Sequence, residues 1–112
     1  MVWTKRPRAA VLDDIRALVT PGWDVARARI GYSRGGAVTL TILNVRRTDG
    51  GTGTQALLTL PARLAPTDHL YGIRTYRGKD VQLLASGQLS IVNPETTVID
   101  HLSLTFVPMG GA

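Results

Sequence analysis

The sequence contains no cysteine, and aromatic residues make up only 5% of its 112 residues. The absence of cysteine excludes disulfides, thiolate metal sites and cysteine nucleophiles. Small secreted domains are often stapled by disulfides, so we expect this chain to assemble inside a cell. Because aromatics are scarce, the core must consist mainly of aliphatic side chains.

Long hydrophobic runs are also missing. No segment approaches the roughly 20 apolar residues of a membrane-spanning helix, so no membrane partner is expected. The N-terminal region is basic at Lys5, Arg6 and Arg8, but the apolar run that follows is broken by Asp13 and Asp14. This pattern is unlike a secretory signal peptide.

Glycine and proline are plentiful, with 12 and 6 residues respectively, and apolar residues make up 44% of the chain. A chain of this length forms one domain with a modest core. Frequent turn residues favour many short strands over long helices.

The central stretch, residues 35–45, alternates apolar and polar side chains, with Val38, Leu40 and Ile42 on one face. This period of two predicts a β-strand. A glycine-rich connection over residues 46–54 leads to a second predicted strand that stops at Pro61. We expect the two strands to form a β-hairpin.

Further strands are predicted on both sides of this hairpin. Residues 24–30 alternate so that Arg27 and Arg29 share one polar face. The other predicted strands cover residues 69–76, 81–85, 89–92 and 98–107, and residues 61–68 form a crossover. About seven strands at even spacing predict a mostly β fold, either an antiparallel β-sandwich or a small barrel.

The N-terminal part is predicted to be an extended arm followed by one short helix over residues 8–19, in which Leu12, Ile15 and Val19 fall at the helical spacing i, i+3, i+7. About twelve residues are too few for a stable isolated helix, so it should pack on the β-domain or on copies of itself. We therefore divide the chain into residues 1–21, for anchoring and oligomerisation, and a β-domain at residues 22–112. The expected anchoring or interface residues are apolar: Trp3, Leu12, Ile15, Val19 and Trp23.

Catalytic chemistry is not indicated, and we expect neither an enzyme nor a bound cofactor or metal. The doublets Asp68-His69 and Asp100-His101 are the nearest approach to a metal site. Neighbours in a strand point to opposite faces, so each doublet offers one ligand per face, whereas a metal needs three or four.

The net charge of +5 is unevenly distributed. Residues 1–80 hold all 13 Lys and Arg and six of the eight acids, which gives +7, and residues 81–112 hold the other two acids, which gives −2. This basic half is either a face for an anionic polymer or a set of solvated strand edges. We favour solvated edges over nucleic-acid binding, because the arginines are scattered, aromatics are few and no nucleic-acid motif is found.

One combination of segments resembles a known family. It comprises Gly22-Trp23, Arg29-Ile30-Gly31, Gly36-Ala37-Val38-Thr39-Leu40, Thr59-Leu60-Pro61-Ala62 with Pro66 following, and a strand pair around Gly87. Residues 22–107 are similar to the small β-sandwich domains of tail-tip, baseplate and tail-fibre (receptor-binding) proteins of tailed bacteriophages, especially those that infect Gram-positive bacteria and actinobacteria.

The resemblance implies a homotrimer that is assembled in the host bacterial cytoplasm and resides in the virion. Its partners would be itself, other virion proteins and a host-surface glycan. The chain lacks a fibre shaft and heptads, which favours a compact minor tail subunit exposed for host-surface binding. Two alternatives stay open: a trimeric capsid decoration protein that stabilises the phage head, and a small basic nucleic-acid-binding module. The candidate contacts with a surface ligand are Tyr32, Arg34, Arg46, Arg47, Tyr76 and Arg77.

Overall fold

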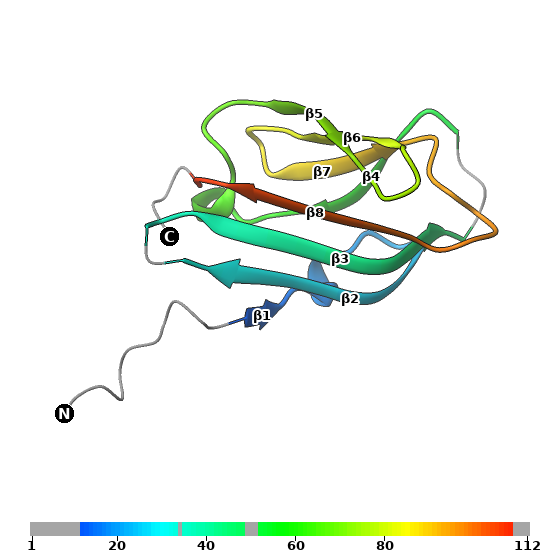
Figure 1. Cartoon of the computed structure of the whole chain (residues 1–112), viewed down its shortest axis with the longest axis horizontal. Helices are drawn as coiled ribbons and strands as arrows, with labels where there is room; N and C mark the ends of the chain where they lie inside the picture. Colours follow the sequence, from blue (N-terminus) through cyan, green and yellow to red (C-terminus); the bar gives the residue numbers. More distant parts are fainter. Residues whose placement is uncertain (1–11, 34, 49–51, 109–112) are drawn as a thin grey trace.

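The computed structural model describes residues 12–33, 35–48 and 52–108. These residues form two antiparallel four-stranded sheets, A and B, which pack together as a sandwich (Figure 1). Sheet A has the strand order β1 (Leu12–Asp14), β2 (Trp23–Tyr32), β3 (Val38–Arg47), β8 (Asp100–Phe106). Sheet B has the order β4 (Thr54–Thr59), β7 (Gln88–Val92), β6 (Asp80–Leu83), β5 (Leu70–Arg74). The prediction of a mostly β sandwich is confirmed, and the alternative of a closed barrel is not adopted.

The core lies between the sheets and is aliphatic, as the composition predicts. On β8, Leu102, Leu104 and Phe106 are buried while Ser103 and Thr105 face solvent, which confirms the alternation read from the sequence. The β6–β7 hairpin is also confirmed, with Leu83 paired to Leu89. The largest buried apolar side chains come from both sheets: Ile30, Val38, Leu40, Ile42, Val45, Leu57, Leu58, Val81, Leu83, Leu89 and Ile91.

A bulge near one end of sheet A shifts the alternation of inward and outward side chains along β3. The β3–β8 register shifts between Ile42 and Val45, and Asn44 adopts a positive φ of 55°. Asparagine tolerates this left-handed conformation better than most residues. Beyond the bulge the inward positions change phase on β2 as well, so that Trp23 turns into the core.

The predicted helix over residues 8–19 is wrong in its described part. Residues 12–14 form strand β1 on the edge of β2, and only a single turn of 3-10 helix, η3 (Arg16–Leu18), follows. An edge strand offers unpaired backbone groups that an adjacent segment can satisfy. The Ile15 N–H also donates to the Ala28 carbonyl at 2.7 Å, so tertiary pairing overrides the weak helical periodicity.

The predicted hairpin of the two central strands is also wrong. β3 pairs with β2 and β8 in sheet A, whereas β4 pairs with β7 in sheet B. A two-residue connection holds consecutive strands together as a hairpin, whereas the longer connection between β3 and β4 leaves each strand free to pair elsewhere. Leu57 and Leu58 are both buried next to a register shift in β4, and this apolar pair suits the sandwich interior.

The Pro61-to-Asp68 crossover is confirmed as the link between β4 and β5, and it contains the 3-10 helix η4 (Ala62–Leu64). It carries the chain from one edge of sheet B to the other. β5, β6 and β7 then return as a meander that ends beside β4, which is a Greek-key arrangement.

Backbone contacts tie the two sheets together on both sides. On one side, Thr20 N–H donates to the Leu57 carbonyl at 2.8 Å and the Trp23 indole donates to the Ala56 carbonyl at 2.9 Å. On the other side, Tyr76 N–H donates to the His101 carbonyl at 2.8 Å. These bonds cover parts of the outer edges of β4 and β8.

Candidate functional site

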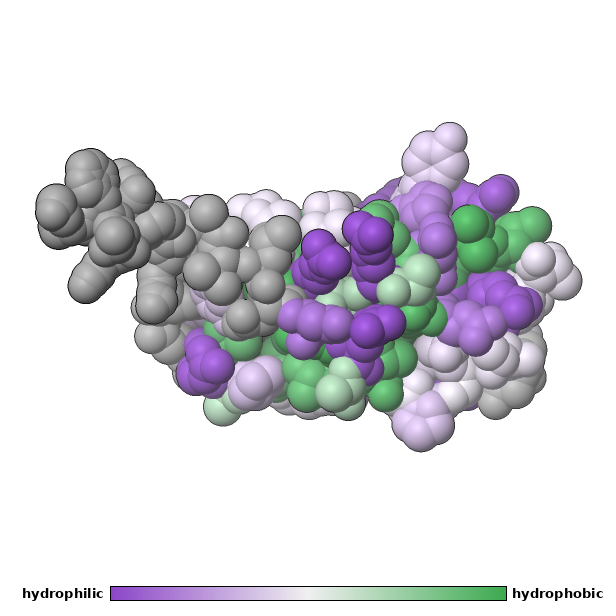
Figure 2. Space-filling model, turned by 90° about the horizontal axis from the view of Figure 1, so that it is seen from below, coloured by the Kyte–Doolittle hydropathy of each residue, from purple (hydrophilic) through white to green (hydrophobic). Residues whose placement is uncertain are grey.

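The strongest candidate site is the solvent-facing surface of sheet A, which we call the outer face. It is made mainly of polar side chains from three neighbouring strands, with the apolar Leu43 and the side-chain-free Gly31 among them. These are Arg27, Arg29, Gly31, Thr39, Thr41, Leu43, His101, Ser103 and Thr105. Figure 2, seen from below, shows hydrophilic side chains interleaved with apolar ones over the described surface on that side of the molecule.

Strand register sets these side chains in rows across the sheet. One row is Gly31, Thr39 and Thr105, in which the two threonine hydroxyls are hydrogen-bonded at 2.8 Å. The next row begins with Arg29 opposite Thr41, which in turn lies opposite Ser103. Because side chains on one face of adjacent strands are neighbours, each row sets polar side chains next to one another.

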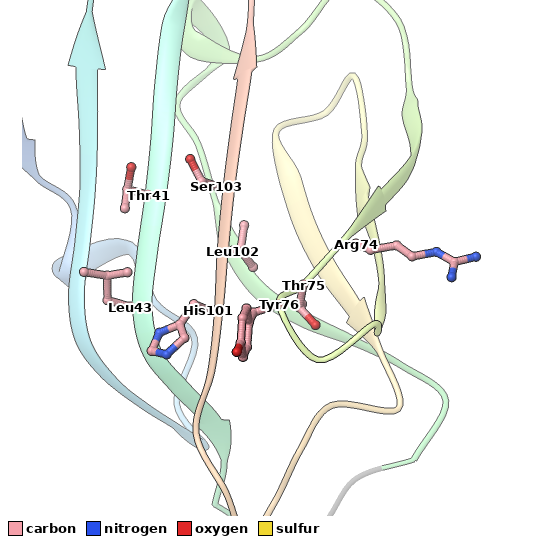
Figure 3. Close-up of a pocket in the computed structure, with 8 residues that line it drawn as sticks. All are labelled: Thr41, Leu43, Arg74, Thr75, Tyr76, His101, Leu102 and Ser103. Atoms are coloured by element: carbon pink, nitrogen blue, oxygen red, sulfur yellow. The ribbon is translucent and has the colours of Figure 1, made fainter.

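Two shallow hollows share the middle of this face. The first has a volume of about 290 Å³ and lies between β3, β8 and the β5–β6 turn (Figure 3). The second, of about 200 Å³, lies between β2 and β3. Thr41 and Leu43 line both, so the hollows are adjacent. In Figure 3, Thr41 and Ser103 lie side by side, while Arg74 extends away from the other labelled residues.

An aromatic group stands at one end of the first hollow. Tyr76 is 81% exposed. Its ring lies edge-on to the imidazole of His101, and the two ring centroids are 6.0 Å apart. His101 accepts the Asn44 N–H at Nδ1, at 3.2 Å. The bulge in β3 therefore fixes this imidazole and leaves its Nε2 as the nitrogen available to a ligand.

Asp100 holds the turn that carries Tyr76. Its carboxyl is buried, and Oδ1 accepts the N–H groups of Arg77 and His101 at 2.9 and 2.8 Å. Within the turn itself, Thr75 N–H donates to the Lys79 carbonyl at 2.9 Å, and Lys79 N–H donates to the Thr75 hydroxyl at 3.0 Å. The position of Tyr76 against β8 is thus set by backbone hydrogen bonds rather than by its exposed ring.

Arg27 and Arg29 give the second hollow its positive charge. Asp14 lies directly opposite Arg29 in the β1–β2 register. However, the Asp14 carboxylate is engaged by Arg16, which donates to it from its backbone N–H at 3.0 Å and from its guanidinium at 3.1–3.3 Å. These hydrogen bonds, the backbone one first, lower the pKa of Asp14 below its ordinary value of 3.8.

The arrangement suits binding better than bond-breaking chemistry. His101 and Ser103 lie two apart on one face of β8, but a Ser–His–Asp relay needs an Nδ1–H that donates to a carboxylate. Here Nδ1 accepts a backbone N–H, and Asp100 points to the opposite face. Hydroxyls, guanidinium groups and an exposed tyrosine are instead the groups that hydrogen-bond to and stack on a polar ligand.

The histidine doublets do not converge. His69 accepts the Ala85 N–H at Nδ1, at 3.0 Å, in the β6–β7 turn region, away from His101. Within residues 12–33, 35–48 and 52–108, no group of three or more His, Cys, Asp or Glu side chains could hold a metal ion.

Of the predicted ligand contacts that the structure describes, Tyr76 is the one that lines either of these two hollows. Arg34 lies outside the described residues. Arg46 forms an ion pair with Asp24 at 2.7 Å. Arg47 lies over the Trp23 ring, 5.3 Å from its centroid, and Arg77 donates from Nε to the Ile99 carbonyl at 2.8 Å. The predicted contact at the end of β2, Tyr32, packs partly buried against the core.

The predicted anchoring residues are placed mostly within this chain's own fold. Ile15 and Trp23 belong to the core, and Val19 packs against it and bridges to Leu58. Leu12 takes its place in β1 opposite Gly31, and Trp3 lies outside the described residues. Because Ile15 contributes to the core, residues 12–20 are structurally continuous with the β-domain.

Sequence reasoning missed most of the outer face as a site. The alternation of residues 24–30 identified a polar face bearing Arg27 and Arg29, and that of residues 35–45 placed Thr39 and Thr41 together. What the sequence did not contain was the order β2-β3-β8, which joins these faces to Ser103 and His101. The signal was present in each strand, but the pairing of strands far apart in sequence was needed to assemble it.

Neither a scan against protein-family models nor a search of curated proteins gives a match to this chain. The likeness to phage tail domains therefore rests on the segments quoted above. In the part of the chain that the structure describes, no helix is long and apolar enough to cross a membrane.

Proposed function

We propose that this chain is a trimeric minor tail subunit of a tailed bacteriophage, in the tail tip or baseplate, exposed for host-surface binding. The observation that carries the proposal is the outer face, where hydroxyls, arginines, His101 and Tyr76 line two adjoining hollows. Such a shallow surface, in which polar groups lie beside the apolar Leu43, fits a glycan, which offers hydroxyls for hydrogen bonding and a sugar face to stack on an aromatic ring.

Three of the segments behind the family resemblance supply further support, because they fall at junctions of the fold. Gly22 has a φ of 102° immediately before β2, and a Cβ there would lie 3.0 Å from the Arg47 guanidinium. The Thr59-Leu60-Pro61-Ala62 stretch begins the crossover between the edges of sheet B. The strand pair around Gly87 is the β6–β7 hairpin.

The first test is the mass of the purified protein, measured by light scattering behind a sizing column. A trimer should have three times the chain mass of 12.1 kDa. Antibody labelling of phage particles then locates the protein. Labelled tail tips support the proposal, labelled heads favour the decoration alternative, and unlabelled particles overturn both.

The second test measures sedimentation of the protein with purified bacterial cell walls. Tyr76→Ala removes the aromatic group at the first hollow and should weaken binding several-fold. Tyr71→Ala is the matched control, because Tyr71 is also exposed, at 62%, but lies on β5 outside both hollows. Equal losses from both variants, or none from either, would remove the outer face as the binding surface.

A further inference from the structure

The second hollow of the outer face is bounded by two arginines on a single strand. Arg27 and Arg29 are separated by one residue, so their side chains emerge on the same side about 7 Å apart. The floor between them is formed by three cross-strand pairs: Arg27 with Leu43, Arg29 with Thr41, and Gly31 with Thr39. The absence of a side chain at Gly31 keeps that end of the hollow open.

Neither arginine has an ion-pair partner among the described residues, although arginines elsewhere in the fold do. Arg46 pairs with Asp24 at 2.7 Å, and Arg74 with Asp80 at 3.3 Å. The carboxylate nearest in register to Arg29 is that of Asp14, and it is bound to Arg16. Among the described residues that line the hollow there are therefore two exposed arginines and two threonine hydroxyls but no carboxylate, although the Asp14 charge acts on Arg29 from the neighbouring strand.

We infer that this hollow is an anion subsite, and that the ligand of the outer face is an acidic polysaccharide. Guanidinium groups hold carboxylates and phosphates through paired N–H donors. When an acidic group of the polysaccharide is bound by Arg27 and Arg29, the sugar chain runs from there towards Tyr76. It passes over Thr41 and Leu43, which line both hollows. The inference deepens the proposed function and rests on it for the source of the polysaccharide, the host surface.

The described outer face favours a polysaccharide over a nucleic acid. Nonspecific single-strand binding proteins present several aromatic rings on which successive bases stack. On the outer face and its adjoining hollows, Tyr76 is the one such aromatic ring among the described residues, besides the imidazole of His101. The other residues that line the hollows carry hydroxyl or guanidinium groups, apart from Leu43, Leu102 and Gly31.

Isothermal titration calorimetry on the full chain tests the inference. The probes are a polygalacturonate fragment, a phosphomannan fragment, a neutral maltooligosaccharide and a single-stranded oligothymidylate of matched length. We expect at least one acidic probe to bind, with an affinity that falls as salt rises. The maltooligosaccharide should bind at least about tenfold more weakly than that acidic probe, which corresponds to one charge-assisted hydrogen bond.

The variants Arg27→Gln and Arg29→Gln should each weaken the affinity for the acidic probe about tenfold or more. Arg63→Gln is the matched control, since it removes the same charge from an exposed arginine in η4, and it should change affinity by less than about twofold. All three side chains are exposed, so circular dichroism and the melting temperature should stay unchanged.

Three outcomes overturn the inference: equal losses from all three variants, tightest binding of the oligothymidylate, or no binding of either acidic probe. The proposed function fails separately. A monomer that is absent from particles but still binds the acidic probe through Arg27 and Arg29 refutes the virion role and leaves the anion subsite. A trimer that labels at the tail tip but binds neither acidic probe supports the virion role and refutes the anion subsite.

Discussion

Asp14 shows how a single exposed carboxylate can be tuned by its neighbour. Its pKa is lowered chiefly by the hydrogen bond from the Arg16 backbone N–H and then by the guanidinium of the same residue. A group with a lower pKa in the folded state stabilises the fold above its unfolded pKa. That contribution is lost as pH falls through the folded value.

We therefore expect the Asp14 carboxyl to titrate below pH 3.8 in a carbon-detected NMR titration. Arg16→Gln should raise this pKa towards 3.8 while leaving the backbone hydrogen bond in place. An Asp14 pKa that is the same in both proteins would mean that the ion pair is not formed in solution.

Asp100 fixes the turn that carries Tyr76, and its replacement should separate hydrogen bonding from charge. Asp100→Ala leaves the N–H groups of Arg77 and His101 without their acceptor, which should lower the free energy of unfolding by about 2 kcal/mol. Asp100→Asn keeps an acceptor oxygen in place of Oδ1. The amide variant should therefore cost less than alanine, although its NH2 group would take the place of Oδ2, which is buried without a hydrogen-bond partner in the described structure.

Denaturant melts of the two Asp100 variants measure this difference. If alanine and asparagine destabilise equally, the carboxyl contributes through charge rather than through the two backbone hydrogen bonds. The same variants connect the residue to the site, because Asp100→Ala should also weaken cell-wall binding by releasing Tyr76 from β8.

At the scale of the elements, the β6–β7 hairpin depends on one glycine. Gly87 has a φ of 94°, and a Cβ there would lie 2.4 Å from the Leu60 carbonyl oxygen. Leu60 N–H also donates to the Gly87 carbonyl at 2.9 Å, so the two backbones are held together. Gly87→Ala should therefore lower the free energy of unfolding by about 3 kcal/mol or more, from backbone strain and overlap together.

Gly78→Ala is the matched control for this effect. Gly78 has a φ of 86°, but an added Cβ would meet no atom within 4 Å. Its cost should be the conformational one alone, about 1–2 kcal/mol. If thermal melts gave equal losses for the two variants, the close approach of Leu60 and Gly87 would not be present in solution.

The inward face of β8 can be tested with neighbouring residues. Leu104 is buried and Thr105 faces solvent in the next position. Leu104→Asp places an unpaired charge in the core and should cost about 3–5 kcal/mol. Thr105→Asp should change stability little, and similar melting temperatures for both variants would contradict the assigned faces of the strand.

The elements that the sequence predicted well are those with a long local alternation. Residues 24–30, 35–45 and 98–107 each carried enough period-two signal to identify β2, β3 and β8. The N-terminal segment failed because Leu12, Ile15 and Val19 match a helical spacing by chance. In the fold, Leu12 lies in a strand, while Ile15 reaches the core and Val19 packs against it.

Strand pairing was less predictable than strand position. β3 and β4 are consecutive in sequence yet belong to different sheets, because the long connection leaves each free to pair elsewhere. The outer face follows from that pairing, which places Thr41 between Arg29 and Ser103. A local pattern can show which side of a strand is polar, but only the strand order shows which polar sides meet.

For the whole molecule, the sandwich should be unevenly stable. β3 and β7 are each paired on both sides, whereas β5 pairs only with β6 among the described strands. The β5–β6 register shifts between Leu70 and Ile73, and Gly72 in this stretch has a φ of 80°. Few buried contacts and an irregular ladder lower the free energy of local opening.

Amide hydrogen exchange should therefore be about tenfold or more faster in β5 than in β3 and β7. The measurement belongs at a dilution where light scattering gives the mass of a single chain, so that no partner covers the edge. Exchange in β5 as slow as in β3 under those conditions would contradict this stability gradient. If β5 slows only when trimers form, its exposed edge is the surface by which the subunits associate.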